Sequence, residues 1–374
     1  MSAQDEIPQQ VGTAVIGAGQ AGLVMGHHLQ RAGEDFVILE AAPRVGDSWR
    51  RRYDSLRLFS PPRYASLPGW PIPVRGFPTR DEMADYLEAY ASRFALPVRT
   101  GTAVHRIARV SDGFVVETGA GTYFAGRVVV TTGAHVRPVV PELAADLDPG
   151  IRQIHSLDYR GPEQLADGGV LVVGAANSGT DVALDAVAAG HPTWLAGRHP
   201  GQVPFDLDAP SSRAVIPVVM FAFRHVLTRR TPMGRRFIAS SDGHGVMLVR
   251  NRLADLDRAG VVRIGRIEAV QDGRPMSTDG VAPEVSTVVW CTGSRPDHAF
   301  LDLPEAFGSD GEPVHVRGVS PVEGLYFLGL EFQFAVASGT IQGLDRDARH
   351  VVRRMRRTAP PTRADARERT PVRG

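Results

Sequence analysis

Short apolar runs alternate with amphipathic segments of helical length in two parts of the chain. In the first part, an apolar run at residues 13–16 leads through a glycine-rich turn into a helical pattern that ends near residue 32. Another apolar run follows at residues 36–39. This order predicts a strand, a helix and a second strand parallel to the first, which is the repeating unit of α/β sheets.

The same order returns after residue 169. An apolar run at residues 170–173 leads into a second turn at residues 174–179, then into a helical pattern and an apolar run at residues 193–195. The chain is therefore predicted to be an α/β protein with two Rossmann-like dinucleotide-binding domains.

The second unit interrupts the first. Strand-like residues 127–134 precede it and residues 287–293 follow it, and each run contains a Thr-Gly pair suited to a turn between domains. We expect the second domain to be inserted into the first, with two domains in tandem as the alternative. The expected division is a first domain at residues 1–160 and 287–357, an inserted domain at residues 161–286, and an Arg- and Pro-rich tail without fixed structure at residues 358–374.

The first glycine-rich turn has the residue types that a dinucleotide site requires. Gly17 permits a tight turn, Gly19 lets the backbone approach a pyrophosphate, and Gly22 lets the helix pack closely on the strand. The helix that begins at Gln20 would present its free N–H groups and the positive end of its dipole to the pyrophosphate. Glu40, at the end of the next strand, is placed to accept hydrogen bonds from a ribose diol.

The second turn, from Gly174 to Gly179, repeats this pattern with an alanine in the middle and with Asn177 and Ser178 at the start of the helix. No acid follows its second strand, and Arg198 stands near that position instead. A cation there favours the 2′-phosphate of NADPH over the free hydroxyl of NADH, although Arg198 could also be an ordinary surface charge. Ser178 is not a hydrolase nucleophile, because the flanking glycines of a GxSxG elbow are missing.

Composition narrows the class of protein. The 374 residues are 43% hydrophobic and 22% charged, and a net charge of +1 gives no general attraction to nucleic acid. Cys291 is the one cysteine, which excludes an intramolecular disulfide and a thiolate metal site. The 12 histidines form no metal-binding spacing, so no metal is expected, and His27 and His28 are interpreted as a surface pair.

No apolar run has the roughly 18 residues that a membrane-spanning helix needs, and residues 1–10 lack the pattern of a signal peptide. We therefore expect a cytoplasmic protein without membrane contact. The nearest approach to a spanning helix is the run at residues 214–223, which Pro217 interrupts. We interpret it as a helix packed against a neighbouring domain, with a membrane surface or a partner as the alternative.

Two dinucleotide folds in one chain indicate that a nicotinamide in one domain passes a hydride to a flavin in the other. Glu40 marks the first domain as the site of FAD, and Arg198 marks the second as the site of NADPH.

Beyond the two turns, four further stretches carry a family resemblance. They are "GDSWRRRYDSLRLFSPPRYASLPGWP" (residues 46–71), "HSLDYRGP" (155–162), "VVWCTGSRPDHAFLDLP" (288–304) and "GLYFLGLEFQFAVASGTIQGLDRDA" (324–348). With the two turns, these stretches make the chain resemble the class B flavin-containing monooxygenases, in particular their short, YUCCA-like bacterial branch. The resemblance covers residues 11–356.

The resemblance implies further site residues. Gly46, Ser48 and Trp49 would line the flavin, while Gln333 and the helix start after Ser338 would approach its ring and ribityl chain. No protein residue is assigned a catalytic role, and the residues expected to form the pocket are Phe59, Gln333 and Phe334. The full set expected to bind the two cofactors is Gly17, Gly19, Gln20, Ala21, Gly22, Glu40, Gly46, Ser48, Trp49, Thr132, Gly133, Gly174, Asn177, Ser178, Gly179, Arg198, Thr292, Gly293, Gln333 and Ser338.

Two departures from the family pattern matter. In the FxGxxxH fingerprint before His155, Pro149 and Ile151 stand where Phe and Gly are expected. Phe59 stands where many relatives have an Asn near the reactive carbon of the flavin. The oxygen-activating arrangement of the family is therefore altered here.

The function implied is monooxygenation with FAD, NADPH and O2. One oxygen atom would enter a small organic substrate through a C4a-(hydro)peroxyflavin, either by N- or S-oxygenation or by carbonyl-directed Baeyer–Villiger or decarboxylating chemistry. An NADPH oxidase or flavin reductase without an oxygenated product is one alternative, and a non-catalytic redox-sensing flavoprotein is another. No nucleic-acid partner is expected, and a homodimer is left open.

Overall fold

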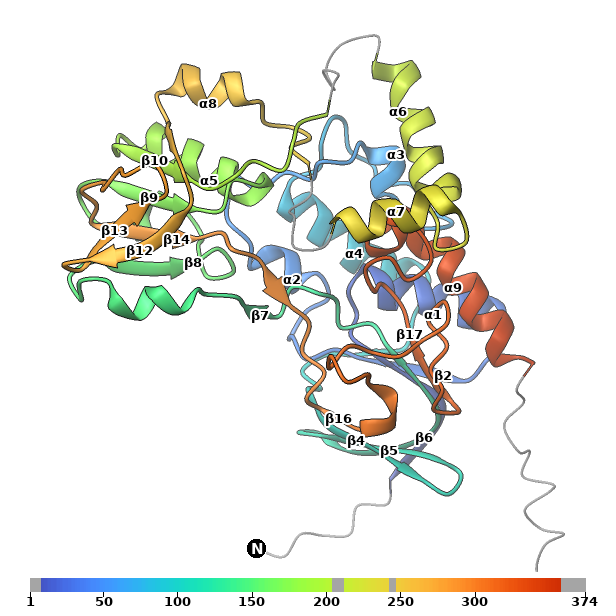
Figure 1. Cartoon of the computed structure of the whole chain (residues 1–374). Helices are drawn as coiled ribbons and strands as arrows, with labels where there is room; N and C mark the ends of the chain where they lie inside the picture. Colours follow the sequence, from blue (N-terminus) through green and yellow to red (C-terminus); the bar gives the residue numbers. More distant parts are fainter. Residues whose placement is uncertain (1–7, 204–211, 242–246, 358–374) are drawn as a thin grey trace, which may run out of the picture.

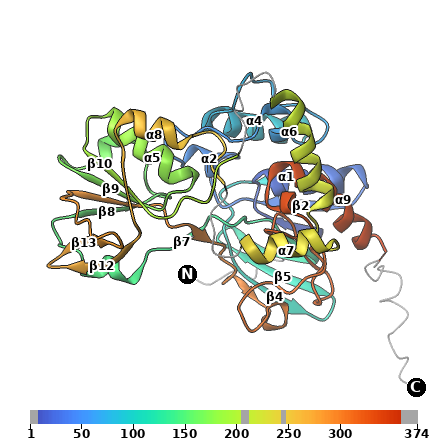
Figure 2. The ribbon, with the colours of Figure 1, turned by 45° about the horizontal axis from the view of Figure 1, so that its top comes forward.

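Two α/β domains lie side by side in the computed structural model, which describes residues 8–203, 212–241 and 247–357 (Figures 1 and 2). The expected tail, residues 358–374, lies outside the described residues. Each domain is built around a sheet with parallel strands, so the expected fold class is confirmed.

The first domain contains an eight-stranded sheet in the order β16-β4-β5-β6-β1-β2-β3, with β17 paired to β6. Strand β5 runs antiparallel to both of its neighbours, β4 and β6, and β1 runs parallel to both β2 and β6. The strands are β1 (Gln9–Ile16), β2 (Phe36–Leu39), β3 (Val98–Arg99), β4 (Val104–Val110), β5 (Gly113–Thr118), β6 (Gly121–Val130), β16 (Leu301–Asp302) and β17 (Leu325–Phe327).

The second domain contains a five-stranded sheet in the order β11-β10-β9-β14-β8, in which every neighbouring pair is parallel. Its central strand β9 is buried along its whole length, as a parallel strand covered on both faces should be. The strands are β8 (Arg152–His155), β9 (Val170–Val173), β10 (Thr193–Ala196), β11 (Val262–Ile264) and β14 (Thr287–Trp290). A hairpin of β12 (Ile267–Gln271) and β13 (Arg274–Ser277) lies beside this sheet.

The expected domain boundaries at residues 161 and 287 are wrong. Strand β14 pairs with β8 and with β9, so both β8 and β14 belong to the second domain. The chain passes between the domains at an antiparallel pair formed by β7 (Arg137–Pro138) and β15 (Ser294–Arg295). All five strands of the second sheet fall between β6 and β16 in the sequence.

Helices cover the sheets. In the first domain α1 packs against α4 and α9, and in the second domain α5 packs against β9, β10 and α8. The α-helices are α1 (Gln20–Arg31), α2 (Asp47–Arg50), α3 (Pro62–Ala65), α4 (Arg80–Arg93), α5 (Asn177–Ala188), α6 (Ser212–Phe221), α7 (Pro232–Ser241), α8 (Leu253–Ala259) and α9 (Ile341–Met355). Other short helical segments are η1 (Glu142–Asp146), η2 (Pro162–Gln164), η3 (Ala222–Val226), η4 (Pro304–Ala306) and η5 (Val336–Gly339).

The apolar run that includes Pro217 forms helix α6, but its packing differs from the prediction. Ile216 is buried, whereas Val218 is 67% exposed and Phe221 is 61% exposed. A neighbouring domain therefore does not cover this face of the helix. Among the described helices, none is long and apolar enough to cross a membrane.

Candidate functional site

The first glycine turn joins β1 to α1, and its backbone is shaped by close packing. Gly17 has φ +100°, a left-handed value that favours glycine. A Cβ atom at Gly22 would overlap the carbonyl oxygen of Gly17, so only glycine fits there. At Gly19 no described residue beyond its chain neighbours has an atom within 4 Å of the Cβ position, so this turn opens onto free space at the N-terminus of α1. The turn therefore offers the cradle for an anion that its sequence predicts.

Thr131 closes this turn from the adjacent strand. Its hydroxyl lies 2.7 Å from the carbonyl oxygen of Ile16 and 3.0 Å from that of Gly17, and it donates to them. The sequence singled out the next residue, Thr132, whose buried hydroxyl has no hydrogen-bond partner in the structure. A polar group of this kind fits a site that a ligand completes. Thr131 was missed because the sequence does not show which of two adjacent threonines faces the turn.

Glu40 also contacts the first turn. One carboxylate oxygen accepts from the N–H of Ala18 at 2.6 Å, and the other accepts from the N–H of Ala42 at 2.9 Å. A carboxylate oxygen has two lone pairs, so both oxygens can still accept from a ribose diol. Glu40 is thus held at the first turn with acceptor capacity to spare, and its contact with a ribose stays a prediction.

Trp49 lies against the start of α1. Its indole N–H donates to the side-chain oxygen of Gln20 at 3.3 Å. Gly46, which begins this segment, has φ +91°, and a Cβ atom there would overlap the backbone of Ala84 in α4. Ser48 is exposed on α2. The structure therefore brings Trp49 to the first turn, and Gly46 lets α2 pack against α4.

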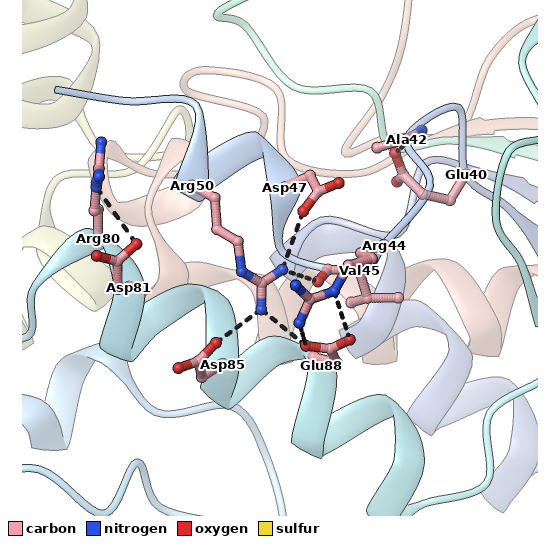
Figure 3. Close-up of polar contacts among 10 residues, drawn as sticks. All are labelled: Glu40, Ala42, Arg44, Val45, Asp47, Arg50, Arg80, Asp81, Asp85 and Glu88. Atoms are coloured by element: carbon pink, nitrogen blue, oxygen red, sulfur yellow. Dashed lines mark hydrogen bonds and ion pairs between the residues drawn. The ribbon is translucent and has the colours of Figure 1, made fainter. Parts of the chain in front are cut away.

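Hydrogen bonds from arginine side chains hold α2 beside the first glycine turn. The sequence did not predict these bonds. The guanidinium group of Arg50 donates to acceptors in α2, in α4 and in the loop before α2, as Figure 3 shows: Val45 O (2.9 Å), Asp47 Oδ1 (3.1 Å), Asp85 Oδ1 (2.8 Å) and Glu88 Oε2 (2.8 Å). Arg44 also donates to Glu88, and this hydrogen bond, together with the charges of both arginines, lowers the pKa of the Glu88 carboxyl. The network anchors the segment that carries Trp49.

The second glycine turn joins β9 to α5 with the same packing. Gly174 has φ +111°, and a Cβ atom at Gly179 would overlap its carbonyl oxygen. The side chain of Asn177 is engaged within the second domain: its Nδ2 donates to the carbonyl oxygen of Met247 at 3.1 Å, and its Oδ1 accepts from the N–H of Val249 at 3.3 Å. Asn177 therefore fixes the 247–249 segment beside the turn.

Arg198 follows β10 at the edge of this turn. A Cβ atom at the preceding Gly197 would lie 3.6 Å from the N–H nitrogen of Ala175, so the two loops are close. Arg198 is exposed, and no carboxylate among the described residues pairs with its guanidinium group. The position and the free charge fit the predicted contact with a 2′-phosphate, which stays a prediction.

Side chains from the first domain bond to α5 in the second. The hydroxyl of Tyr53 donates to Oδ2 of Asp181 at 2.9 Å, and that of Ser55 donates to Asp185 at 2.6 Å. Oδ1 of Asp181 accepts from Arg250 and Asn251. Burial raises the pKa of the Asp181 carboxyl, and the charge of Arg250 opposes this effect. The sequence did not predict this contact, because its partners are far apart in the chain.

The predicted Thr-Gly turns lie where the chain crosses between the domains. The hydroxyl of Thr292 donates to the carbonyl oxygen of Val139, and the ring Nε2 of His155 lies 3.0 Å from the carbonyl oxygen of Gly293. These contacts join the two segments in which the chain passes between the domains. Gly133 has φ +77° and is exposed, and within the described part of the chain only its chain neighbours come within 4 Å of its Cβ position.

The segment before α9 is buried more deeply than the sequence indicated. Gln333 is 0% exposed; its Oε1 accepts from the N–H of Gly329 at 3.1 Å, whereas its buried Nε2 has no partner. The hydroxyl of Ser338 donates to Asp347 at 2.6 Å and accepts from the N–H groups of Phe334 and Ala335, both at 3.0 Å. The hydroxyl therefore has no hydrogen-bonding capacity left. The start of α9 follows at Thr340, and its approach to the flavin stays a prediction.

Phe334 and Phe59, two of the residues expected to form the pocket, have different surroundings. The ring of Phe334 is flanked by guanidinium groups, the nearest of which is that of Arg317 at 3.8 Å from the ring centre. Arginine side chains therefore contact Phe334, and its role in a substrate pocket stays a prediction. Phe59 lies in the loop before α3 with 41% of its surface exposed, so it is free to contact a ligand.

The two turns fit bound dinucleotides. Each has the left-handed glycine and the close glycine pair of a nucleotide-binding loop, each opens at the N-terminus of a helix, and Glu40 and Arg198 stand at the matching ends of the next strands. The acid and the cation distinguish the two sites chemically.

Comparisons with known proteins agree with this geometry. Residues 14–234 match the family model described as pyridine nucleotide-disulphide oxidoreductase. A CzcO-like oxidoreductase of Geobacillus kaustophilus is 35% identical over 91% of this chain and 97% of its own length. A probable indole-3-pyruvate monooxygenase, YUCCA3 of Arabidopsis thaliana, is 27% identical over 85% of this chain and 82% of its own. A flavin-containing monooxygenase structure from Stenotrophomonas maltophilia superimposes with a TM-score of 0.76, at 27% identity over 93% of this chain and 99% of that one.

The chain belongs to the class B flavin-containing monooxygenase family. As a member of this family, it is an oxidoreductase that uses a flavin and a nicotinamide cofactor. With a single cysteine, the chain cannot form an internal disulfide for dithiol–disulfide exchange. Burial raises the pKa of the Cys291 thiol to about 12, which keeps it in the unreactive protonated form.

Proposed function

We propose that this family member is an FAD- and NADPH-dependent monooxygenase that inserts one oxygen atom of O2 into a small organic substrate. The observation that carries the proposal is the pair of glycine turns, one followed by Glu40 and the other by Arg198. When bound, FAD and NADPH supply the electrons that activate O2.

The residues of the chain bind and orient these groups. The N-terminus of α1 and Gly19 would receive the pyrophosphate of FAD, and Glu40 would accept hydrogen bonds from its adenosine ribose. Arg198 would bind the 2′-phosphate of NADPH through charge-assisted hydrogen bonds. Trp49, held at the start of α1 by Gln20, would cover the flavin and exclude water.

A substrate panel tests this proposal. The purified protein is supplied with FAD, NADPH and ¹⁸O2 and is offered a thioether, a tertiary amine, a cyclic ketone and a 2-oxo acid in separate reactions. We expect one ¹⁸O atom in the product of at least one class. The class that reacts separates N- or S-oxygenation from carbonyl-directed chemistry. Incorporation of ¹⁸O from labelled water instead would contradict direct transfer from O2.

An NADPH oxidase is the second candidate, and Phe59 is the observation that favours it. An aromatic ring cannot donate the hydrogen bond that an amide at this position would supply. An oxidase would form one hydrogen peroxide for each NADPH consumed. It would also leave every substrate of the panel without ¹⁸O.

A further inference from the structure

Three guanidinium groups surround the ring of Phe334. Their Cζ atoms lie 3.8 Å (Arg317), 4.7 Å (Arg346) and 5.7 Å (Arg230) from the ring centre. Arg230 precedes α7, Arg346 belongs to α9, and Arg317 lies in the turn before β17. The N–H of Arg229 donates to the carbonyl oxygen of Phe334 at 2.8 Å, which fixes the segment before α7 beside the segment before α9. Both views show α7 close to α9 (Figures 1 and 2).

The charges of this cluster are not balanced. Arg346 forms an ion pair with Asp347 at 2.9 Å. The side chain of Asp347 is 2% exposed and also accepts a hydrogen bond from the hydroxyl of Ser338. No carboxylate in the described part of the chain pairs with Arg230 or Arg317. The Nε of Arg317 is buried and has no hydrogen-bond acceptor among the residues that the structure describes. Among the described residues, no anion therefore balances the two guanidinium groups held against this ring.

The surroundings of Arg317 disfavour the unbalanced positive charge of this cluster. Burial, together with the charges of Arg230, Arg346 and Arg353, lowers the pKa of Arg317 although Asp347 opposes the effect. Arg317 also has φ +55°, a strained backbone value for a residue other than glycine. Cations that repel one another in a partly buried site are stabilised by a bound anion.

His350 faces the same cluster from α9. Burial first, and then the charges of Arg317, Arg353 and Arg354, lowers its pKa to about 4. The imidazole is therefore neutral at neutral pH and adds no charge to the cluster. Asp347 is the facing carboxylate, and its ion pair with Arg346 leaves the positive charge of Arg230 and Arg317 in place.

We propose that Arg230 and Arg317 form a binding site for an oxyanion, namely a phosphate or carboxylate group, at the edge of the Phe334 ring. The planar guanidinium fork matches two oxygens of such a group, and stacking on Phe334 orients the fork before the ligand arrives. None of the three arginines belongs to a glycine turn, and the proposed oxygenation does not require the oxyanion site. It is therefore an additional ligand site of the first domain.

The oxyanion could belong to a soluble molecule or to a lipid headgroup. Helix α6 and η3 lead directly to Arg230, and Val218 and Phe221 on α6 expose apolar side chains. Surfaces that bind anionic lipid combine exposed apolar groups with arginines. The shared chemistry is an oxyanion on two guanidinium groups, and the test separates the two sources.

The experiment uses the full chain saturated with FAD and NADP⁺, so that the nucleotide turns are filled. Inorganic phosphate is titrated calorimetrically at constant ionic strength, and cosedimentation is measured with vesicles of phosphatidylcholine alone and of an equimolar mixture with phosphatidylglycerol. The variants are R317Q and R230Q. The matched control is R258Q, because Arg258 is an exposed arginine of α8 in the second domain.

We expect saturable binding that R317Q and R230Q each weaken at least tenfold and that R258Q leaves unchanged. Phosphate binding identifies a soluble oxyanion as the source, and binding only to the phosphatidylglycerol vesicles identifies a headgroup. Absence of saturable binding to either probe, or binding that both R317Q and R230Q leave unchanged, would overturn the proposal. R230Q keeps the test valid if R317Q fails to fold, because Arg230 is exposed.

Discussion

The hydroxyl of Tyr53 donates a 2.9 Å hydrogen bond to Oδ2 of Asp181, across the boundary between the two domains. Tyr53 follows the segment that places Trp49 at the first glycine turn, and Asp181 lies one turn of helix after the second. Both side chains are at least 90% buried. The bond therefore fixes the relative position of the two proposed cofactor sites through a short chain of residues.

Replacing Tyr53 by Phe should weaken this link. We expect a loss of about 1 kcal/mol in the free energy of unfolding, because Asp181 keeps its bonds from Arg250 and Asn251. Flavin reduction at saturating NADPH should also slow, whereas flavin content should not change. Chemical denaturation and stopped-flow absorbance measure the two effects. Tyr159→Phe is the matched control, because the buried hydroxyl of Tyr159 has no hydrogen-bond partner. A wild-type rate of reduction in Tyr53→Phe would show that the bond does not set the geometry.

The two glycines of the first turn should respond differently to substitution. Gly19→Val should give a folded but colourless protein, because the side chain enters open space where the pyrophosphate would lie. Gly22→Ala should destabilise the fold itself, because its Cβ atom overlaps the backbone of Gly17. Circular dichroism and flavin absorbance separate these outcomes. A yellow Gly19→Val protein would place the flavin elsewhere.

Arg198→Ala should raise the KM for NADPH at least tenfold and leave the KM for NADH nearly unchanged. Charge-assisted bonds to a phosphate contribute about 1.5–3 kcal/mol each, and NADH lacks that phosphate. Steady-state kinetics with both coenzymes measure the effect. Arg263→Ala is the control, because Arg263 is an arginine on β11 that pairs with Asp257. Equal effects on both coenzymes would make Arg198 an ordinary surface charge.

Phe59→Asn should lower the amount of hydrogen peroxide formed per NADPH when no substrate is present. The amide would supply a polar contact worth about 3 kcal/mol at a developing charge, which outweighs the loss of apolar cover. Phe59 is exposed, so the change should not disturb the core. An unchanged peroxide yield would show that Phe59 lies away from the flavin.

His27 should make the protein sensitive to acid. Its ring packs on Phe94 at 4.7 Å between centres, both of its nitrogens lack partners, and burial lowers its pKa to about 4. In the unfolded chain the imidazole of His27 becomes protonated near pH 6.5. In the folded protein it stays neutral until the pH falls to about 4. Stability is therefore complete above pH 6.5 and falls as the pH drops, by about 2 kcal/mol between pH 7.5 and 5.

Urea denaturation at the two pH values tests this effect. His27→Leu should lose less stability on acidification than the wild type does, whereas the exposed His105→Leu should behave like the wild type. Equal acid sensitivity in His27→Leu would assign the loss to another group. His350, whose pKa is also lowered to about 4, would be the next histidine to replace.

The local parts of the fold were predictable from the sequence. The first turn needs a left-handed backbone at Gly17 and close packing at Gly22, and both requirements favour glycine. The motif can therefore be recognised from the sequence alone. The amphipathic helix α4, with the capping box of Thr79 and Glu82, is local in the same sense.

What depends on distant residues was not predictable. The pairing of β8 with β14 joins segments more than a hundred residues apart. Because of this pairing, both domain boundaries differ from those expected from the sequence. His27 was expected at the surface, yet α4 covers it with Phe94. The hydroxyl of Ser338 bonds to Asp347 because η5 and α9 fold onto each other, which no spacing rule indicates.

The nesting of one sheet inside the other has a consequence for synthesis on the ribosome. β17 completes the first sheet by pairing with β6, and α9 covers α1, but both are translated only after the whole second domain has emerged. At about 5–20 residues per second, the apolar edge of β6 and the open face of α1 wait on the order of ten seconds or more for these partners. The inserted domain can fold during that interval, whereas the domain that begins the chain is the last to be finished.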